Sequence, residues 1–282
     1  MSWFVFALVY VFLASIGNIL RKVLMRDDRT DIVGSSIIFQ WVGTLICAVI
    51  AFWHGFHMPP VREYPLNYFL TASLWGFATL ALYKAYKYIE ASEVTILIAL
   101  ESVVTIITAM SLLHETFTLV NAIGTILIIF AVMYMSQVSG NFKFNKGVLY
   151  ALVYSLLAGV AIVNDTFNLK HADIFSYMVV GFFLPGFFIF IINPKIITKM
   201  KPLFQPVVFA KNAVSTLFIT LAANSFYLAI ANGGEASQVN TIAQAAVVVT
   251  VLFSIVALKE RDHLLKKFVC AILVTIGVLL LR

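Results

Sequence analysis

The sequence has few charged residues. Only 11% of its 282 residues are Asp, Glu, Lys or Arg, whereas 62% are hydrophobic. Soluble domains carry roughly 25% charged residues, which coat a surface that this chain has too few charges to cover. This shortage argues against a soluble enzyme, a disordered protein and a nucleic-acid-binding protein. It predicts a polytopic membrane protein that is surrounded by the lipid bilayer.

Cysteines and catalytic motifs are also scarce. The two cysteines, Cys47 and Cys270, lie within hydrophobic runs, and no CxxC or Cys/His spacing suits a metal ion. His114 and Glu115 begin an HExxH pattern, but Thr118 occupies the position of the second histidine. The patterns GxSxG, GxxxxGK[ST] and GxGxxG are missing too. We therefore expect no enzyme activity, no cofactor and no metal site.

The hydrophobic residues form ten segments, each long enough for a membrane helix of about 20 residues. We predict an all-α membrane protein whose ten transmembrane helices cover residues 2–20, 32–53, 66–88, 91–113, 118–138, 147–166, 172–193, 206–231, 236–258 and 263–281. The connections between these segments are short. They leave no room for a separate domain outside the membrane, so the function must reside among the helices.

The sequence contains an internal repeat at a constant offset of 145 residues. Residues 90–115 and 235–260 share nine of 26 positions, including Glu-Ala-Ser at the start and Leu-x-Glu at the end. Five helices in each half would invert one half relative to the other. We predict a first repeat over 1–138, a linker over 139–146 and a second repeat over 147–282. Inverted repeats are typical of secondary transporters, in which two similar halves alternate access to a site near the midplane.

The residues around this repeat resemble a known family. The segment YIEASEVTILIALES, the later segment LLHETFTLVNAIGTILIIFAV and the opening ASIGNILRK are similar to EamA-like ten-helix members of the drug/metabolite transporter superfamily. The matching positions are Gly17, Asn18, Lys22, Leu113, Glu115, Gly124, Leu258, Glu260 and Gly277. The resemblance implies a ten-helix transporter. Ser102 and Val247 depart from it, because the family often has proline there, as does Gln40, near which the family often has arginine.

Glu101 is the leading candidate for a functional residue. It lies within one residue of the centre of the predicted span 91–113. An ionisable group at this depth costs about 2.5–3.5 kcal/mol to insert, which makes it a functional candidate by default. Thr105 and Thr108 extend a polar stripe from it along the helix. We interpret Glu101 as a substrate counter-ion or a proton-coupling carboxylate; the alternative is an acid that only joins helices by hydrogen bonds.

Other polar side chains inside the predicted helices indicate a shared polar cavity. The candidate substrate-binding residues besides Glu101 are Asn18, Gln40, Trp41, Lys84, Asn164, Asn224 and Gln244. Asn240 is a further amide within the ninth span. Amides also serve as hydrogen-bonding groups between helices. Lys84 would hold a substrate carboxylate or pair with Glu101, or would extend to the membrane surface, as Lys87 would.

Several polar residues receive a structural interpretation. We expect Tyr83, Tyr86 and Tyr88 to form an aromatic belt at the membrane surface. Asp165 is interpreted as a solvated helix end. Glu115 and Glu260 are interpreted as carboxylates that stabilise the first turn of the helix following each of them.

The basic residues indicate an orientation. The chain has a net charge of +6, and the predicted topology places 16 basic residues on one side of the membrane and three on the other. The positive-inside rule assigns the richer side to the cytoplasm, which places both termini outside. Some ten-helix relatives have cytoplasmic termini, and the charge distribution contradicts that analogy.

These observations predict a multi-pass secondary active transporter in the plasma or inner membrane. Its partners are a small organic substrate, such as an amino-acid-like metabolite, and protons or another coupling ion. Two alternatives remain: an exporter of organic cations or drugs, for which an acid with aromatic residues is suited, and a flippase for a lipid-linked carrier. A membrane enzyme or structural subunit is disfavoured by the missing motifs.

Overall fold

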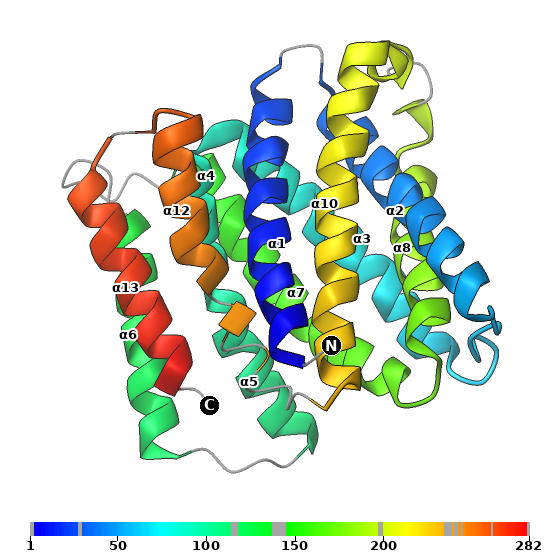
Figure 1. Cartoon of the computed structure of the whole chain (residues 1–282), viewed down its shortest axis with the longest axis horizontal. Helices are drawn as coiled ribbons and strands as arrows, with labels where there is room; N and C mark the ends of the chain where they lie inside the picture. The colour runs from blue at the N-terminus through cyan, green and yellow to red at the C-terminus, as the bar shows by residue number, and fades with distance from the viewer. Residues whose placement is uncertain are drawn as a thin grey trace.

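The computed structural model describes residues 3–27, 30–113, 118–136, 145–196, 200–233, 239, 242–243, 245–260 and 262–280. All regular elements in these residues are helical (Figure 1). The α-helices are α1 (Trp3–Arg26), α2 (Ile32–His54), α3 (Pro65–Tyr88), α4 (Ala91–Ile98), α5 (Leu100–Leu113), α6 (Leu119–Ser136), α7 (Lys146–Leu169), α8 (Ile174–Ile192), α10 (Pro206–Ala231), α12 (Ala245–Ala257) and α13 (Leu264–Leu280). Two short 3₁₀ helices, η1 (Pro194–Ile196) and η2 (Lys201–Phe204), separate α8 from α10.

The helices confirm the predicted class. Each of the ten predicted spans contains at least one of them, and the fourth span is divided between α4 and α5. Six helical stretches within the described residues are long and hydrophobic enough to cross a membrane: Trp3–Arg26, Ile32–His54, Ala91–Thr108, Lys146–Leu169, Ile174–Ile192 and Pro206–Ala229. The chain is thus an all-α membrane protein.

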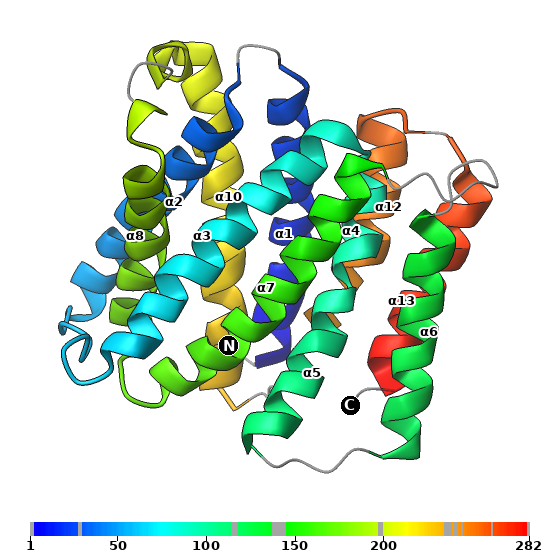
Figure 2. The same ribbon diagram turned by 180° about the vertical axis from the view of Figure 1, so that it is seen from behind.

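The helix packing has an internal symmetry that agrees with an inverted repeat. α1 packs against α10 and α12, whereas its equivalent in the second half, α7, packs against α3 and α5. α2 pairs with its own equivalent α8, and α6 pairs with α13. Exchanging the two halves leaves this set of pairs unchanged. α1 ascends in Figure 1, whereas α7 descends in Figure 2, so the equivalent helices run in opposite directions.

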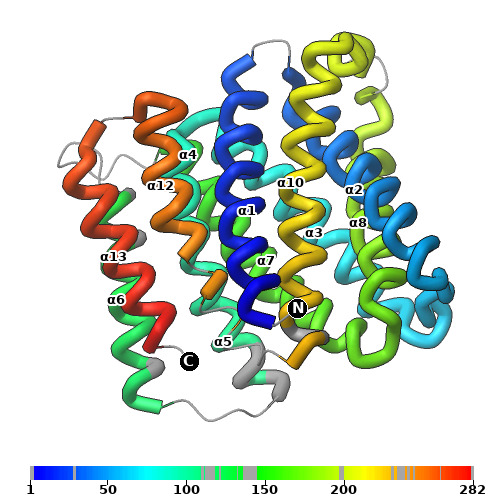
Figure 3. Tube along the Cα trace, in the orientation of Figure 1, coloured from blue at the N-terminus to red at the C-terminus, as the bar shows by residue number. Residues whose placement is uncertain are grey.

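The halves are interleaved in space. The three most closely paired sets of long helices, α1 with α10, α2 with α8 and α3 with α7, each join one half to the other. The beginning of α1 and the end of α13 lie at the same end of the bundle, as an even number of crossings requires (Figure 3).

Two helices differ from their predicted extents. α1 continues to Arg26, past the predicted end at Leu20, because Leu24 and Met25 are fully buried and extend its hydrophobic face. The predicted helix 91–113 is interrupted at Ala99, whose N–H donates to the Ile96 carbonyl at 3.3 Å. The N–H of Ser102 in turn donates to the Ala99 carbonyl at 3.1 Å, so this turn has the tighter i to i−3 pattern of a 3₁₀ helix. The interruption immediately precedes Glu101.

Two glycines bring α6 and α13 into backbone contact. A Cβ atom on Gly124 would lie 2.5 Å from the carbonyl oxygen of Gly277, and one on Gly277 would lie 2.8 Å from that of Gly124. Small residues at such a crossing let membrane helices approach closely. The two glycines recognised in the family resemblance therefore share one packing role.

Candidate functional site

Glu101 lies in the first turn of α5, just after the interruption at Ala99, and is half-buried. The hydroxyl of Tyr154 on α7 lies within hydrogen-bonding reach of its carboxylate. No Lys or Arg among the described residues forms an ion pair with Glu101. A Cβ atom on Gly159 of α7 would lie 2.9 Å from the Glu101 carbonyl oxygen, so the two helices touch at this level. The carboxylate therefore lies between the two repeats.

Three tyrosines lie close enough to Glu101 to interact with its charge. Tyr10 on α1, Tyr154 on α7 and Tyr227 on α10 all interact electrostatically with its carboxylate. Each of these side chains is half-buried. The tyrosines were not among the predicted site residues, because an uncharged tyrosine in a hydrophobic run gives little signal. Tyr10 and Tyr154 lie well inside their predicted spans, away from the interfacial ends where tyrosine is usual, and this is the feature that distinguishes them.

Arg21 is buried in an aromatic cage. Its guanidinium carbon lies 5.1, 5.2 and 5.7 Å from the ring centroids of Phe39, Tyr83 and Tyr86. The residue is only 3% exposed, and both tyrosines are fully buried. The prediction that Tyr83 and Tyr86 form an interfacial belt is therefore wrong, although Tyr88 is exposed. The same cation–π contacts explain why Arg21 lies in the helix and not in the loop that the sequence indicated.

A charged network joins the repeats where α3 meets α4. The Lys22 ammonium donates to the carbonyls of Tyr86 and Ile89 at 2.8 and 2.5 Å, and so caps the end of α3. The Lys267 ammonium pairs with Glu90 and also donates to the Glu260 carbonyl. Charges from α1, α13 and the segment before α13 thus converge on one helix junction.

Glu260 completes this network, in a role that differs from the predicted one. Its carboxylate accepts hydrogen bonds from the Ala91 N–H at 3.2 Å and the Ser92 hydroxyl at 3.1 Å, and pairs with Arg26 at 3.1 Å. It therefore caps α4 in the other repeat and not the following helix, α13. The interleaved packing of the two halves places the Glu260 carboxylate against the first turn of α4. Glu115, its repeat equivalent, lies outside the described residues.

A second polar network lies at the end of the bundle where α1 begins. Asp165 accepts hydrogen bonds from Trp75 Nε1 at 2.8 Å and from the Tyr177 hydroxyl at 2.6 Å. It is 5% exposed, so its interpretation as a solvated helix end is wrong. Helices α3 and α8 cover this end of α7, which the sequence of α7 alone does not reveal.

Asn164 belongs to the same network. Its amide nitrogen donates to the Thr71 hydroxyl at 2.9 Å, and its oxygen accepts from Asn67 at 2.9 Å. The predicted binding residue Asn164 is thus fully engaged in helix–helix hydrogen bonds.

The other predicted site residues are dispersed. Gln40 is buried and donates to the Thr79 hydroxyl at 2.8 Å, and Asn224 donates to the Thr220 carbonyl at 2.8 Å. The Lys84 ammonium lies 4.9 Å from the centroid of Tyr150 and forms no ion pair with Glu101. Asn18 is half-buried on α1. Gln244 and Asn240 lie outside the described residues.

Among the predicted residues that the structure describes, Trp41 and Asn224 each have a buried side-chain polar atom without a hydrogen-bond partner, Nε1 and Oδ1 respectively. The ring of Trp41 packs on Gly186 of α8 and on Phe190. The seven predicted residues that the structure describes are distributed over α1, α2, α3, α5, α7 and α10.

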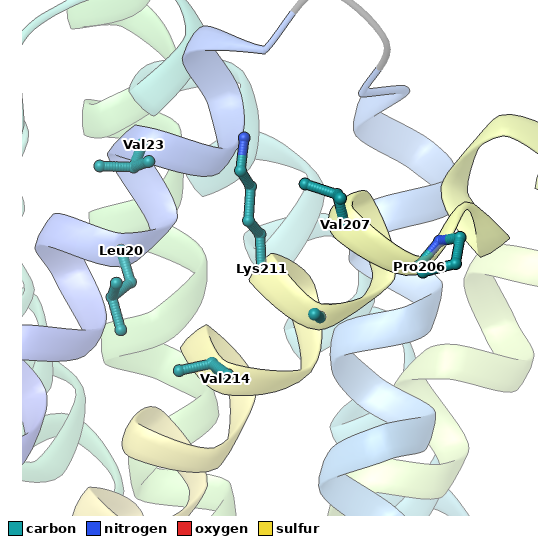
Figure 4. A pocket seen from close by; sticks show the side chains of 7 residues that line it. Leu20, Val23, Pro206, Val207, Lys211 and Val214 are labelled. Atoms are coloured by element: carbon teal, nitrogen blue, oxygen red, sulfur yellow. The ribbon is translucent and has the colours of Figure 1, made fainter.

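A cavity of about 530 Å³ lies elsewhere, between α1 and α10 (Figure 4). Its lining is hydrophobic except for Lys211, whose ammonium pairs with Asp27 at 3.0 Å. None of the predicted site residues lines it, so we assign it no part in the site. No group of three potential metal ligands occurs within the described part of the chain.

Comparison with known proteins agrees with the fold. No curated protein matches the chain. A solved structure titled only as the crystal structure of a protein matches with a TM-score of 0.67 and 14% sequence identity, over 98% of this chain and 94% of the other. The sequence model of the EamA-like transporter family matches residues 1–137 and again residues 145–282, which together span almost the whole chain. The chain therefore belongs to the EamA-like transporter family, and so to the drug/metabolite transporter superfamily.

Proposed function

We propose that this transporter is a secondary active carrier of a small organic metabolite that bears a protonated amine, with Glu101 as the counter-ion. The observation that carries the proposal is the Glu101 carboxylate, which forms no ion pair with a basic residue in the described part of the chain and has the Tyr154 hydroxyl within hydrogen-bonding reach. An unpaired acid inside a membrane bundle marks a substrate or proton site by default. Tyrosine rings and hydroxyls favour a bound ammonium group through cation–π contacts and hydrogen bonds.

The position of Glu101 suits coupling to a gradient. A carboxylate that binds an ammonium group must be ionised, whereas an empty site in a hydrophobic bundle favours the protonated acid. Substrate binding would then release a proton from the carboxyl group, and substrate release would take one up. This exchange makes a proton gradient the natural driving force, with the plasma or inner membrane as the location.

The interleaved halves suggest which parts move. Motion of one repeat as a rigid body against the other would separate α1 from α10, α2 from α8 and α3 from α7. We therefore assign the moving surfaces to the contacts of α5 with α7 and of α1 with α12, which are equivalent by the repeat. Glu101 and Tyr154 lie on the first of these surfaces, so a change there would alter access to the site.

Counterflow in proteoliposomes tests this function. Proteoliposomes that contain the protein are loaded with one of a panel of unlabelled amino acids and primary amines. Uptake of the same compound in labelled form is then followed with and without a proton gradient. We expect counterflow of at least one amine-bearing compound, and its loss in Glu101→Gln. Transport of only neutral or anionic solutes, or a fully active Glu101→Gln variant, would contradict the proposal. Transport restricted to hydrophobic organic cations would instead support a drug exporter.

A further inference from the structure

The cavity between α1 and α10 lies at the end of the bundle where α1 ends and α10 begins (Figure 4). Its volume of about 530 Å³ falls in the range of about 300–1,000 Å³ that is typical of small-molecule sites. Leu20 and Val23 of α1 and Val207 and Val214 of α10 contribute hydrophobic walls. Val207 and Ala210, which also lines the cavity, are exposed. The cavity therefore opens on the surface of the bundle, which faces lipid in a membrane protein.

A second hydrophobic groove lies on the other side of α1, between this helix and α12. Its volume is about 220 Å³, and it is lined by Ile16, Ile19 and Leu20 of α1 together with Phe253 and Val256 of α12. Leu20 lines both spaces, so the two grooves meet at this residue. Two hydrophobic grooves that meet at one point suit a molecule with two hydrocarbon chains, as a phospholipid has.

Lys211 is the charged residue of the first cavity. Figure 4 shows its side chain extending from α10 toward the end of α1, away from Val214. The ammonium donates to Asp27 at 3.0 Å, and the Lys211 side chain is 36% exposed. An ammonium group has three N–H donors, and Asp27 takes one of them. The cavity thus has a cation near the end of the bundle and hydrophobic walls toward its middle, which is the polarity of a lipid in one leaflet.

The surrounding charges favour an anionic headgroup. Residues 193–211, which lead from the end of α8 into α10, contain four lysines and no acid. Lys195 and Lys201 in this segment are exposed, and the 3₁₀ helix η2 that begins at Lys201 packs on α10. Basic residues at the end of membrane helices attract anionic lipid headgroups, and basic pockets between such helices bind them. A zwitterionic headgroup has no net charge and gains less from these lysines.

We propose that the two grooves beside α1 bind one anionic phospholipid, with its acyl chains in the grooves and its phosphate on Lys211. Asp27 then competes with the phosphate for the same ammonium group. The lipid site goes beyond the proposed function, because it involves neither Glu101 nor the tyrosines near it. It joins α1 to α10 and α12 from the lipid-facing side.

Thermal unfolding of the full-length protein in a detergent with an uncharged headgroup tests this site, because a ligand raises the apparent Tm by mass action. The probes are dioleoyl phosphatidylglycerol and dioleoyl phosphatidylcholine, which share the same chains. We expect tighter binding of phosphatidylglycerol. Lys211→Gln should weaken it about fivefold, to the affinity of phosphatidylcholine, because a charge-assisted hydrogen bond is lost at a half-exposed position. The exposed Arg62→Gln, which removes a charge from the connection between α2 and α3, is the matched control.

Asp27→Asn separates lipid binding from a purely structural ion pair. It breaks the same pair as Lys211→Gln does, but it removes the competitor of the phosphate, so phosphatidylglycerol should bind more tightly than to wild type. Equal or weaker binding by Asp27→Asn overturns the site, and this outcome can be read even if Lys211→Gln does not fold. Equal affinity of wild type for the two lipids also overturns it.

Two further measurements test the grooves. Ala210→Trp places a large side chain in the first groove and should weaken both lipids, whereas unchanged affinity would remove the acyl chain from this cavity. Glycerol 3-phosphate carries the phosphate without the chains and should leave the Tm unchanged. If it stabilises the protein as phosphatidylglycerol does, Lys211 binds a soluble phosphate and the lipid site is wrong.

Discussion

The carboxylate of Glu260 in the second repeat accepts hydrogen bonds from both the hydroxyl and the backbone N–H of Ser92 in the first, at 3.1 and 3.4 Å. The contact spans 168 positions of sequence. Because Ser92 lies in the first turn of α4, the carboxylate satisfies N–H groups that no intrahelical carbonyl can reach. It also meets the positive end of the helix dipole. The junction that leads to Glu101 is thus held by a residue of the other repeat.

Replacing Glu260 by Gln should weaken this junction. The amide nitrogen would face an N–H or guanidinium donor, so the loss should be about 1–3 kcal/mol. The apparent Tm of the detergent-purified protein should fall by several degrees. Ser92→Ala removes a single hydroxyl from the same contact and should lower the Tm less. Equal Tm values for Glu260→Gln and wild type would mean that the cap contributes nothing to stability.

Glu101→Gln should leave a folded protein that no longer couples transport to a proton gradient. The amide keeps the size and hydrogen-bonding capacity of the acid but cannot release a proton or pair with an ammonium group. Size-exclusion profile and Tm should match wild type, while gradient-driven uptake in proteoliposomes is lost. Ser111→Ala, at an exposed position further along α5, is the control and should transport normally. Uptake by Glu101→Gln with an unchanged pH dependence would assign the acid to helix packing.

Asp165 and Tyr177 should be energetically coupled. Their hydrogen bond is 2.6 Å long and buried, and Trp75 Nε1 occupies the other carboxylate oxygen. Asp165→Asn places an amide nitrogen against a donor and should lower the Tm, as should Tyr177→Phe. The double variant should lose less than the sum of the two single losses, since both remove the same interaction. Additive losses would show that the two residues act independently.

The α6–α13 contact predicts a sharp difference between two glycines. Gly124→Ala would place a methyl group 2.5 Å from a backbone oxygen, so the helices must separate, and we expect destabilisation of about 1–3 kcal/mol. Gly181→Ala on α8 meets nothing closer than the Tyr177 ring at 3.6 Å. It should be neutral or stabilising, because alanine favours a helix more than glycine does. Similar Tm values for the two variants would contradict close packing at Gly124.

The charge distribution predicts an external C-terminus. An alkaline phosphatase fused to the C-terminus should be active, because this enzyme is active only outside the cytoplasm. Green fluorescent protein fused to the C-terminus should not fluoresce, because it does not fold into its fluorescent form when it is exported unfolded. The reverse pair of results would place both termini in the cytoplasm, as in some relatives. A fusion after residue 145, on the opposite side, serves as the internal control.

Local sequence properties determined the class and the helices, and they singled out Glu101 as a candidate. Hydrophobic segments of membrane length are recognised one at a time, because each must bury its own backbone hydrogen bonds in lipid. The repeat required only a comparison of the chain with itself, and the helix packing agrees with it. Glu101 stood out for a similar reason, since a charge in the middle of a hydrophobic run is conspicuous without any knowledge of its neighbours.

The partners of the polar residues were decided by the tertiary structure. Arg21 follows a hydrophobic run and resembles the start of a loop until Phe39, Tyr83 and Tyr86 are brought around it. Asp165 resembles a solvated end until Trp75 and Tyr177 cover it. Whether a polar group near a helix end meets water or protein depends on which other helices pack there. That choice is made by contacts between residues far apart in the chain, and the local hydrophobic pattern carries no information about them.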